Sequence, residues 1–300
     1  MRVLVTGSQG FVGRHLIAHL EKSGDVVRGI DREHDVTSVA AMREVFADVR
    51  PEVIYHLAAL THVGDSWRQA SEFNRVNVVG TQCVLDAAHA GVPSALTLIV
   101  SSAEVYGVVT DADQPLRESF RVAPSNPYSA SKVEAELVAR EAARVRAQRV
   151  IIARPFNHLG PGQALTFVVP ALVNRLLEAR ERGEDEIAVG DLSTRRDFSD
   201  VRDVVRAYRL LALLGAAGET YNVASGHDVA VRDIATQLVS RLAPEVRLVV
   251  DATLLRPIEV PVARGSVKKL HDATGWSPAI PLHVSLSDVI ADVEARRRNE

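Results

Sequence analysis

The sequence contains little that suits secretion, a membrane or a nucleic acid. Cys83 is the single cysteine among 300 residues, so no internal disulfide can form. No apolar run is long enough to cross a bilayer, and the first residues lack the apolar core and cleavage site of a secretory signal. The formal net charge of -3 argues against the broad excess of Lys and Arg that nucleic acids or anionic membranes require. We expect a cytoplasmic protein with no nucleic-acid or membrane partner.

Metal-binding patterns are also scarce. His15 and His19 have the spacing of metal ligands on a helix, but no carboxylate or cysteine partner is evident nearby, so we expect no metal site. The 47% of apolar and 24% of charged residues are typical of a water-soluble globular protein. A chain of this length can bury a sizeable core in one or two domains.

The first half of the chain alternates short apolar runs with longer amphipathic segments. This pattern is typical of strand–helix units that build a parallel sheet with helices on both faces. The strands expected are 2–6, 26–30, 53–57, 96–100 and 149–153, each apolar enough for a central position in the sheet. The helices expected are 11–23, 39–49, 78–90 and 128–146.

The pattern changes after Arg154, where proline and glycine interrupt the chain more often. A helix over 167–182 and a strand over 219–223 are expected in this second region. We therefore predict an α/β fold with a Rossmann-type, doubly wound parallel sheet over residues 1–160, rejoined by part of 195–225. A smaller, mostly C-terminal α/β substrate-binding domain is expected over 161–300.

A glycine-rich turn directly follows the first expected strand. Gly7 permits the tight turn, Gly10 lets the backbone approach a pyrophosphate, and Gly13 lets the next helix pack closely on the sheet. The N-terminus of that helix offers unpaired N–H groups to an anion. The pattern predicts a dinucleotide site. The cofactor-binding residues expected on this turn are Gly7, Gln9, Gly10, Phe11 and Val12.

The end of the second strand bears on the choice of cofactor. Asp31 stands where an acidic side chain accepts hydrogen bonds from the adenosine ribose, which favours NAD(H). Arg32 could instead hold a 2′-phosphate, so NADP(H) remains possible. Further cofactor contacts are expected at Asp35 and Val36 beside the adenine, and at Leu57, Ala58 and Ala59 beside the pyrophosphate and ribose.

A second cluster of polar residues follows the strand 96–100. Ser102 lies at the carboxyl edge of the expected sheet, where such folds bind ligands. Tyr128 and Lys132 are four residues apart on a helix and can therefore converge on one point. We expect the ammonium of Lys132 to lower the pKa of the Tyr128 phenol toward neutrality. Ser102 would then orient a reacting oxygen with which Tyr128 exchanges a proton.

Together, the glycine turn and the Ser–Tyr–Lys set resemble the extended short-chain dehydrogenase/reductase family over essentially the whole chain. In that family the Tyr and the Lys are the catalytic pair, and the Ser completes a triad. The resemblance implies that Tyr128, Lys132 and Pro155 also contact the cofactor. In this family the equivalents of helices 78–90 and 128–146 pair across a twofold axis, which implies a homodimer.

The second half narrows the resemblance to the GDP-4-keto-6-deoxy-D-mannose reductases, which form GDP-D-rhamnose. The segments that carry it are 154–163, 195–203, 255–261 and 269–282. Arg196 and Arg256 offer planar charged forks to a diphosphate. The substrate-binding residues implied are Asn157, Val168, Arg196, Arg256 and Glu259. An ion-pair ladder over 195–203 is the structural alternative.

Other activities stay open at this point. Glu104 stands two residues beyond Ser102, where related sugar 4,6-dehydratases place a base, so we count it as a candidate catalytic residue. A GDP-mannose 4,6-dehydratase is therefore the alternative, although Ala103 lacks the polar side chain that many dehydratases carry. The same triad also serves 4-epimerases. A dinucleotide-sensing protein without turnover is disfavoured, because such proteins usually lack the Tyr–Lys pair.

Overall fold

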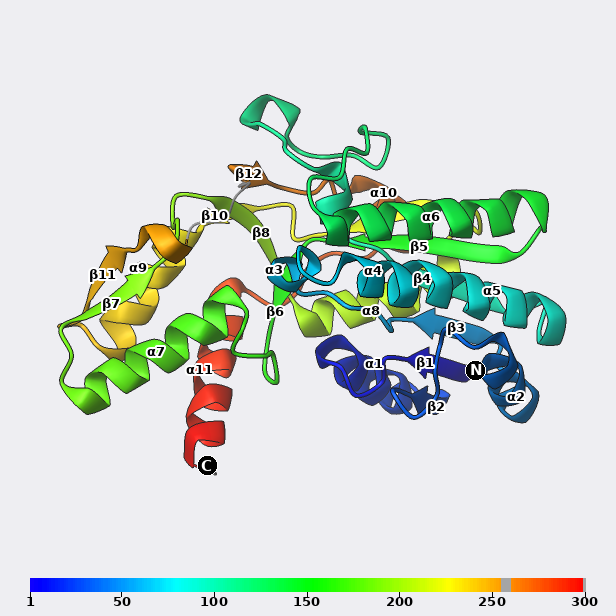
Figure 1. Cartoon of the computed structure of the whole chain (residues 1–300), viewed down its shortest axis with the longest axis horizontal. Helices are drawn as coiled ribbons and strands as arrows, with labels where there is room; N and C mark the ends of the chain where they lie inside the picture. The colour runs from blue at the N-terminus through cyan, green and yellow to red at the C-terminus, as the bar shows by residue number, and fades with distance from the viewer. Residues whose placement is uncertain (255–259, 299–300) are drawn as a thin grey trace.

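The computed structural model describes residues 1–254 and 260–298, and its largest sheet has six parallel strands. The strand order is β2-β1-β3-β4-β5-β9, so the order reverses beside β1 in the manner of a Rossmann sheet. The strands are β1 (Arg2–Thr6), β2 (Val26–Ile30), β3 (Val53–His56), β4 (Leu96–Val100), β5 (Arg149–Pro155) and β9 (Thr220–Val223). Figure 1 shows this sheet in the half of the molecule that holds the N-terminus.

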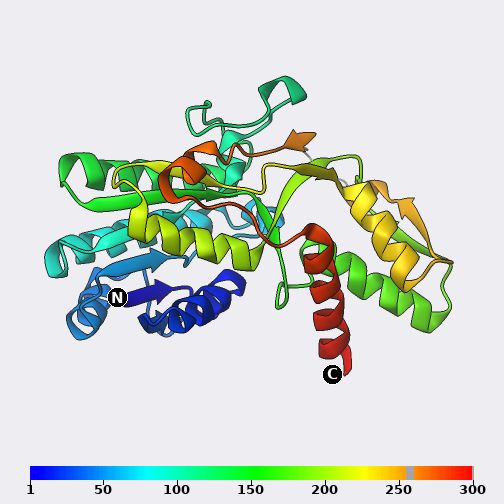
Figure 2. The same cartoon turned by 180° about the vertical axis from the view of Figure 1, so that it is seen from behind.

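Helices cover both faces of the sheet. One face carries α1 (Phe11–Lys22), α8 (Val201–Leu214) and α10 (Lys268–Thr274), and the other carries α2 (Val39–Val49), α5 (Gly80–Gly91) and α6 (Pro127–Val145). Figures 1 and 2 show the two layers from opposite sides. Strand residues alternate between them: Val3 and Val5 pack in the cluster with α8, and Leu4 packs in the cluster with α2. The predicted doubly wound α/β fold is thus confirmed.

Most expected elements of this sheet are found at or within two residues of their predicted ends. One expectation was wrong: β2 is not a central strand but an edge strand, and Val26 is 71% exposed. The helix expected over 78–90 starts earlier, because α4 (Ala70–Phe73) and the π-helix η1 (Asn74–Val79) continue directly into α5.

A second group of elements lies beside the sheet, in the other half of Figure 1. Its strands are β6 (Asn157–Leu159), β7 (Glu186–Val189), β8 (Arg195–Asp200), β10 (Asp228–Ala230), β11 (Arg247–Val250) and β12 (Val262–Ala263). Its helices are α7 (Val168–Arg182), α9 (Val231–Leu242) and α11 (Leu282–Arg298), which share one buried apolar cluster. Two elements that fall between these in sequence are part of the other half of the molecule: β9 is an edge strand of the six-stranded sheet, and α8 packs on one face of that sheet.

The remaining elements are short. They are α3 (Val63–Ser66), the 3-10 helices η2 (Ala103–Tyr106) and η3 (Asp111–Asp113), and η4 (Ala252–Leu254). The helices of the described residues include none that is both long and apolar enough to cross a membrane.

Candidate active site

The turn between β1 and α1 forms a cradle for an anion. Gly7 has a φ of +71°, and a Cβ there would lie 2.8 Å from the backbone nitrogen of Ala58. A Cβ at Gly13 would collide with the carbonyl oxygen of Gly7. Gly10 caps α1 without a side-chain hydrogen bond, so side chains leave the helix N-terminus open. These features fit the pyrophosphate of a dinucleotide.

Asp31 closes the same turn from the end of β2. Its Oδ2 accepts a hydrogen bond of 2.8 Å from the backbone N–H of Gln9, and its Oδ1 accepts one of 3.0 Å from that of Arg32. The carboxylate is therefore fixed over the glycine turn, while Arg32 is exposed. A fixed carboxylate suits ribose hydroxyls and repels a 2′-phosphate.

The other expected cofactor residues lie along the neighbouring strand ends. Leu57, Ala58 and Ala59 follow β3 and are partly exposed, as a rim for a ligand requires. Asp35 accepts two hydrogen bonds from Thr37, which lower the pKa of its carboxyl group. Val36 is only 9% exposed and packs in the apolar core beside α2. We had expected it to lie against the adenine, and its burial leaves little of the side chain for that contact.

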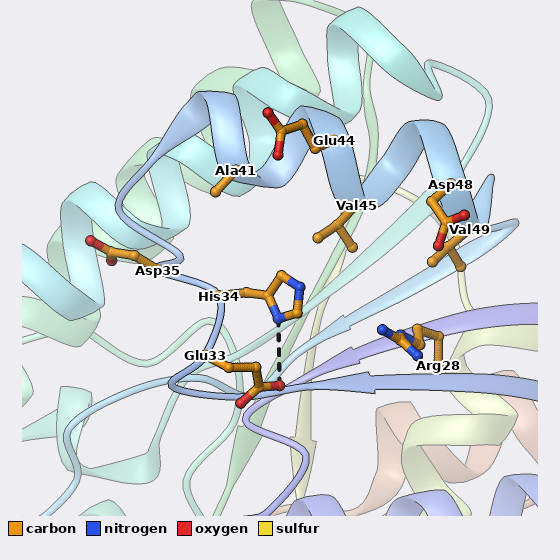
Figure 3. Close-up of a pocket in the computed structure, with 9 residues that line it drawn as sticks. All are labelled: Arg28, Glu33, His34, Asp35, Ala41, Glu44, Val45, Asp48 and Val49. Atoms are coloured by element: carbon orange, nitrogen blue, oxygen red, sulfur yellow. Dashed lines mark ion pairs between the residues drawn. The ribbon is translucent and has the colours of Figure 1, made fainter.

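A cavity of about 350 Å³ lies between the segment that follows β2 and the helix α2 (Figure 3). Its lining residues are Arg28, Glu33, His34, Asp35, Ala41, Glu44, Val45, Asp48 and Val49. The imidazole of His34 faces the carboxylate of Glu33 at 3.4 Å. The cavity shares only Asp35 with the expected cofactor residues and is lined by none of the expected catalytic residues, so we place no part of the active site there.

The three expected catalytic side chains meet at the carboxyl edge of the sheet. Ser102 follows β4, and its hydroxyl lies close enough to the phenol of Tyr128 to act on the pKa of that phenol. Lys132 lies one turn further along α6, and its ammonium donates a hydrogen bond of 2.8 Å to the carbonyl oxygen of Val100. Asn126 and Pro127 start α6 with a side-chain cap and a first-turn proline, which fixes where Tyr128 emerges.

Burial dominates the electrostatics of this pair. It raises the pKa of Tyr128 to about 12, with a further increase from Glu104 and a partly opposing hydrogen bond from Ser102. It lowers the pKa of Lys132 to about 8, against the opposing charge of Glu136. The expected lowering of the Tyr128 pKa by Lys132 was therefore wrong, because desolvation of the phenol dominates its pKa. A phenol with a raised pKa holds its proton and suits a proton donor.

Glu104 is partly buried next to this triad. Its backbone N–H donates to the Ser102 hydroxyl at 3.2 Å, and its Oε2 accepts a hydrogen bond of 3.3 Å from the side chain of Asn126. Our sequence reasoning did not single out Asn126. The available signal was its position before Pro127, which is typical of a helix cap that lies beside the catalytic tyrosine.

Three of the expected substrate residues lie on the second group of elements. Asn157 is in β6 and Arg196 is in β8, and these strands pair in register, with Asn157 opposite Phe198. The guanidinium of Arg196 donates to the carbonyl oxygen of Arg195 at 2.9 Å. Val168 is 39% exposed at the start of α7. Arg256 and Glu259 lie outside the described residues.

The alternative of an ion-pair ladder over 195–203 holds for part of that segment. Arg195 pairs with Asp228 at 2.5 Å, and Arg202 bridges Asp200 and Asp288 at 2.7 Å each. The buried Asp197 instead accepts hydrogen bonds from Ser225 and from backbone N–H groups. Ion pairing therefore explains Arg195 and Arg202.

A Rossmann sheet with a glycine turn, and with serine, tyrosine and lysine together at its carboxyl edge, defines a protein of the short-chain dehydrogenase/reductase class. The family model for the NAD dependent epimerase/dehydratase family matches residues 3–224. The chain belongs to that family.

Relatives resemble the chain over its full length. A GDP-6-deoxy-D-mannose reductase from Pseudomonas aeruginosa is 35% identical over 100% of this chain and 99% of its own. A GDP-6-deoxy-D-talose 4-dehydrogenase from Aggregatibacter actinomycetemcomitans is 31% identical over 92% of each chain. The solved structure of RMD from Pseudomonas aeruginosa complexed with NADPH matches with a TM-score of 0.90 at 34% identity, over 99% of this chain and 100% of that one.

Proposed function

We propose that this protein is an NAD(P)H-dependent reductase of a GDP-linked 4-keto-6-deoxy sugar, converting GDP-4-keto-6-deoxy-D-mannose to GDP-D-rhamnose. The observation that carries the proposal is the position of Ser102 beside the buried phenol of Tyr128, at the carboxyl edge of a dinucleotide-binding sheet, where burial raises the pKa of that phenol to about 12. Full-length similarity to a GDP-6-deoxy-D-mannose reductase supports the substrate class.

Each residue of the site has its own part in the proposed reduction. NAD(P)H, held by the glycine turn and Asp31, supplies a hydride to carbon 4 of the keto sugar when it is bound. Ser102 donates a hydrogen bond to the carbonyl oxygen and so polarises it, and Tyr128 transfers its phenolic proton to the same oxygen. Lys132 lies one helical turn from Tyr128, and its positive charge would stabilise the phenolate that remains. Tyr128, Lys132 and Pro155 line the cofactor side of this point.

The nucleotide end of the substrate is assigned to the second group of elements. We propose that Asn157, Arg196 and Arg256 bind the diphosphate, because amide and guanidinium donors match phosphate oxygens. Val168 would line this site at the start of α7, and Glu259 would bind a ribose. We further propose a cofactor domain over 1–160 that is completed by part of 195–225, and a substrate domain over 161–300.

We propose that NADH is the preferred cofactor. The carboxylate of Asp31 is fixed by the backbone N–H groups of Gln9 and Arg32, so it cannot turn away from a 2′-phosphate without losing both hydrogen bonds. The exposed Arg32 supports NADPH instead, and the relative of known structure was solved with NADPH.

The dehydratase is the second candidate, and one observation favours it: Glu104 lies close enough to Tyr128 to raise its pKa. A 4,6-elimination also needs a proton donor for the departing hydroxyl group, and the methyl side chain of Ala103 cannot be one. A 4-epimerase would use the same triad without net consumption of cofactor.

We propose a cytoplasmic homodimer. The single cysteine suits a reducing compartment. Leu137 and Val145, on one exposed face of α6, are 61% and 66% exposed, and an apolar face of this kind favours burial against a second copy.

The proposed reaction is tested with cofactor that carries deuterium at the transferred position of the nicotinamide. Purified enzyme, this cofactor and GDP-4-keto-6-deoxy-mannose should give a GDP-6-deoxyhexose with one deuterium, located at carbon 4 by NMR. Conversion of GDP-mannose to its carbon-4 epimer, without net oxidation or reduction of the cofactor, would support the epimerase. Release of the keto sugar from GDP-mannose would support the dehydratase.

A further inference from the structure

A buried ion pair lies beneath the catalytic residues and takes no part in the proposed chemistry. Glu136 of α6 and Arg154 of β5 are 3% and 1% exposed. Arg154 donates twice to the Glu136 carboxylate, from Nε at 2.8 Å and from Nη2 at 2.7 Å. The hydroxyl of Ser101 adds a third hydrogen bond of 2.6 Å. The carboxylate is thus held on several sides in a fixed geometry.

Each member of this cluster is close in sequence to a site residue. The pairs are Ser101 next to Ser102, Arg154 next to Pro155, and Glu136 one helical turn beyond Lys132. Ser101 and Arg154 lie on the α6 side of the sheet, because they continue the alternation of Ile99 and Ile152. The cluster therefore joins β4, β5 and α6 just below the edge where the proposed catalytic residues emerge.

The cluster continues toward the segment that follows Ser102. Arg154 donates to the phenol oxygen of Tyr106 at 3.1 Å and stacks over its ring at 4.9 Å. Tyr106 in turn donates to Asn222 of β9 at 2.7 Å. Since Tyr106 ends the short helix η2, which Ser102 caps, the network fixes both sides of the serine.

Glu136 also acts on Lys132 through its charge. Burial lowers the pKa of Lys132 to about 8, and the carboxylate of Glu136 opposes this shift. The carbonyl oxygen of Val100 and the imidazole of His56 also face Lys132. Burial, together with Lys132, lowers the pKa of His56 to about 3, so this imidazole stays neutral at working pH. Arg154 and Arg140 face Glu136 from its other sides.

We propose that Glu136 is a positioning residue for the reaction: held by Arg154 and Ser101, it fixes Ser102 and α6 against each other and places a carboxylate one helical turn from Lys132. This inference rests on the proposed catalytic role of Lys132. Stability alone is a weak reason for such a pair, because replacing buried ion pairs with apolar residues often costs nothing.

The test compares the pH profiles of the wild type and Glu136→Gln. Without the carboxylate, Lys132 loses its proton at a lower pH. The alkaline limb of kcat should therefore move to lower pH by about half a unit or more, while the KM for the sugar nucleotide changes less than about twofold. Glu219→Gln is the matched control, since Glu219 lies directly before β9 and pairs with Lys269 at the surface. Its profile should match the wild type.

Two further variants keep the proposal testable if Glu136→Gln does not fold. Glu136→Asp keeps the charge but withdraws it by one methylene group, so kcat should fall about tenfold with the alkaline limb unmoved. Ser101→Ala removes one hydrogen bond and should show a smaller fall of the same kind. A Glu136→Gln profile that superimposes on the wild type after scaling, or wild-type kcat in Glu136→Asp, overturns the proposal.

The affinity for NAD(P)H, followed by its fluorescence across pH, separates failure of this inference from failure of the proposed function. Lys132 is expected to hydrogen-bond the nicotinamide ribose, so its deprotonation should weaken binding. If the wild type reduces no keto sugar, the proposed reaction fails, but the binding limb should still shift in Glu136→Gln. If the wild type reduces the sugar and neither limb shifts, the proposed reaction stands and the role of Glu136 is refuted.

Discussion

The ammonium of Lys132 donates a hydrogen bond of 2.8 Å to the carbonyl oxygen of Val100, the last residue of β4. This bond ties the helix α6 to the end of the strand β4, two residues before Ser102. It therefore helps to fix the position of Ser102 relative to the helix that carries Tyr128 and Lys132. Lys132 is also buried, with 7% of its surface exposed. Burial lowers the pKa of its ammonium group, so the group loses its proton at a pH closer to neutrality.

Activity should therefore fall as the pH rises through about 8. The pKa of Lys132 in the folded protein is lowered to about 8, so the ammonium is present below that pH and lost above it. The measurement is kcat between pH 6 and 10. In Lys132→Arg the guanidinium stays charged over this range, so whatever activity remains should lack the alkaline limb. An unchanged limb in that variant would assign the ionisation to another group.

Glu104 should matter little to the reduction. We expect Glu104→Gln to keep kcat within about tenfold of the wild type, because general acid or base catalysis contributes more than that, roughly 100-fold to 10,000-fold. The wild type should form no keto sugar from GDP-mannose and NAD⁺. A loss on the larger scale, together with keto-sugar formation by the wild type, would replace the reductase with the dehydratase.

Asp31 should determine the preference for NADH. Removal of its carboxylate in Asp31→Ala takes away a charge-assisted hydrogen bond to the ribose and a repulsion against the 2′-phosphate. The ratio of kcat/KM values for NADPH and NADH should then rise about tenfold or more. Arg32→Ala should lower kcat/KM with NADPH and leave NADH unaffected. Preference of the wild type for NADPH, unchanged in Asp31→Ala, would contradict this account.

The exposed face of α6 should form the dimer contact. Light scattering should give a dimer for the wild type and a monomer for Leu137→Glu, because a carboxylate in an apolar interface has no partner. Leu214→Glu is the control, since Leu214 is 57% exposed at the end of α8, on the other face of the sheet. A monomeric wild type would contradict the proposed homodimer.

The sequence predicted the large sheet well, because its buried strands are short apolar runs that begin and end at turn residues. Ser102, Tyr128 and Lys132 lie at the carboxyl edge of this sheet. The edge position of β2 was missed, since apolar content does not show how many neighbours a strand has. The helix was expected to start only at residue 78, because polar residues such as Asn74 and Asn77 interrupt the apolar pattern before it. In the structure, η1 continues through these residues.

The supporting contacts of the site could not be predicted from the sequence. Glu136 and Arg154 are 18 residues apart in sequence, so only the fold shows that they pair. The sign of the Tyr128 shift was also missed, because the spacing of Tyr128 and Lys132 shows proximity but not how far burial excludes water from the phenol.

The central claim is tested most directly by the loss of absorbance of NADH or NADPH when GDP-4-keto-6-deoxy-mannose is added. We expect prompt oxidation by the wild type. In Tyr128→Phe it should be about 100-fold slower or more, while cofactor binding is retained, because only the proton donor is removed. Oxidation by Tyr128→Phe at the wild-type rate, or none by the wild type with either cofactor, would contradict the assignment.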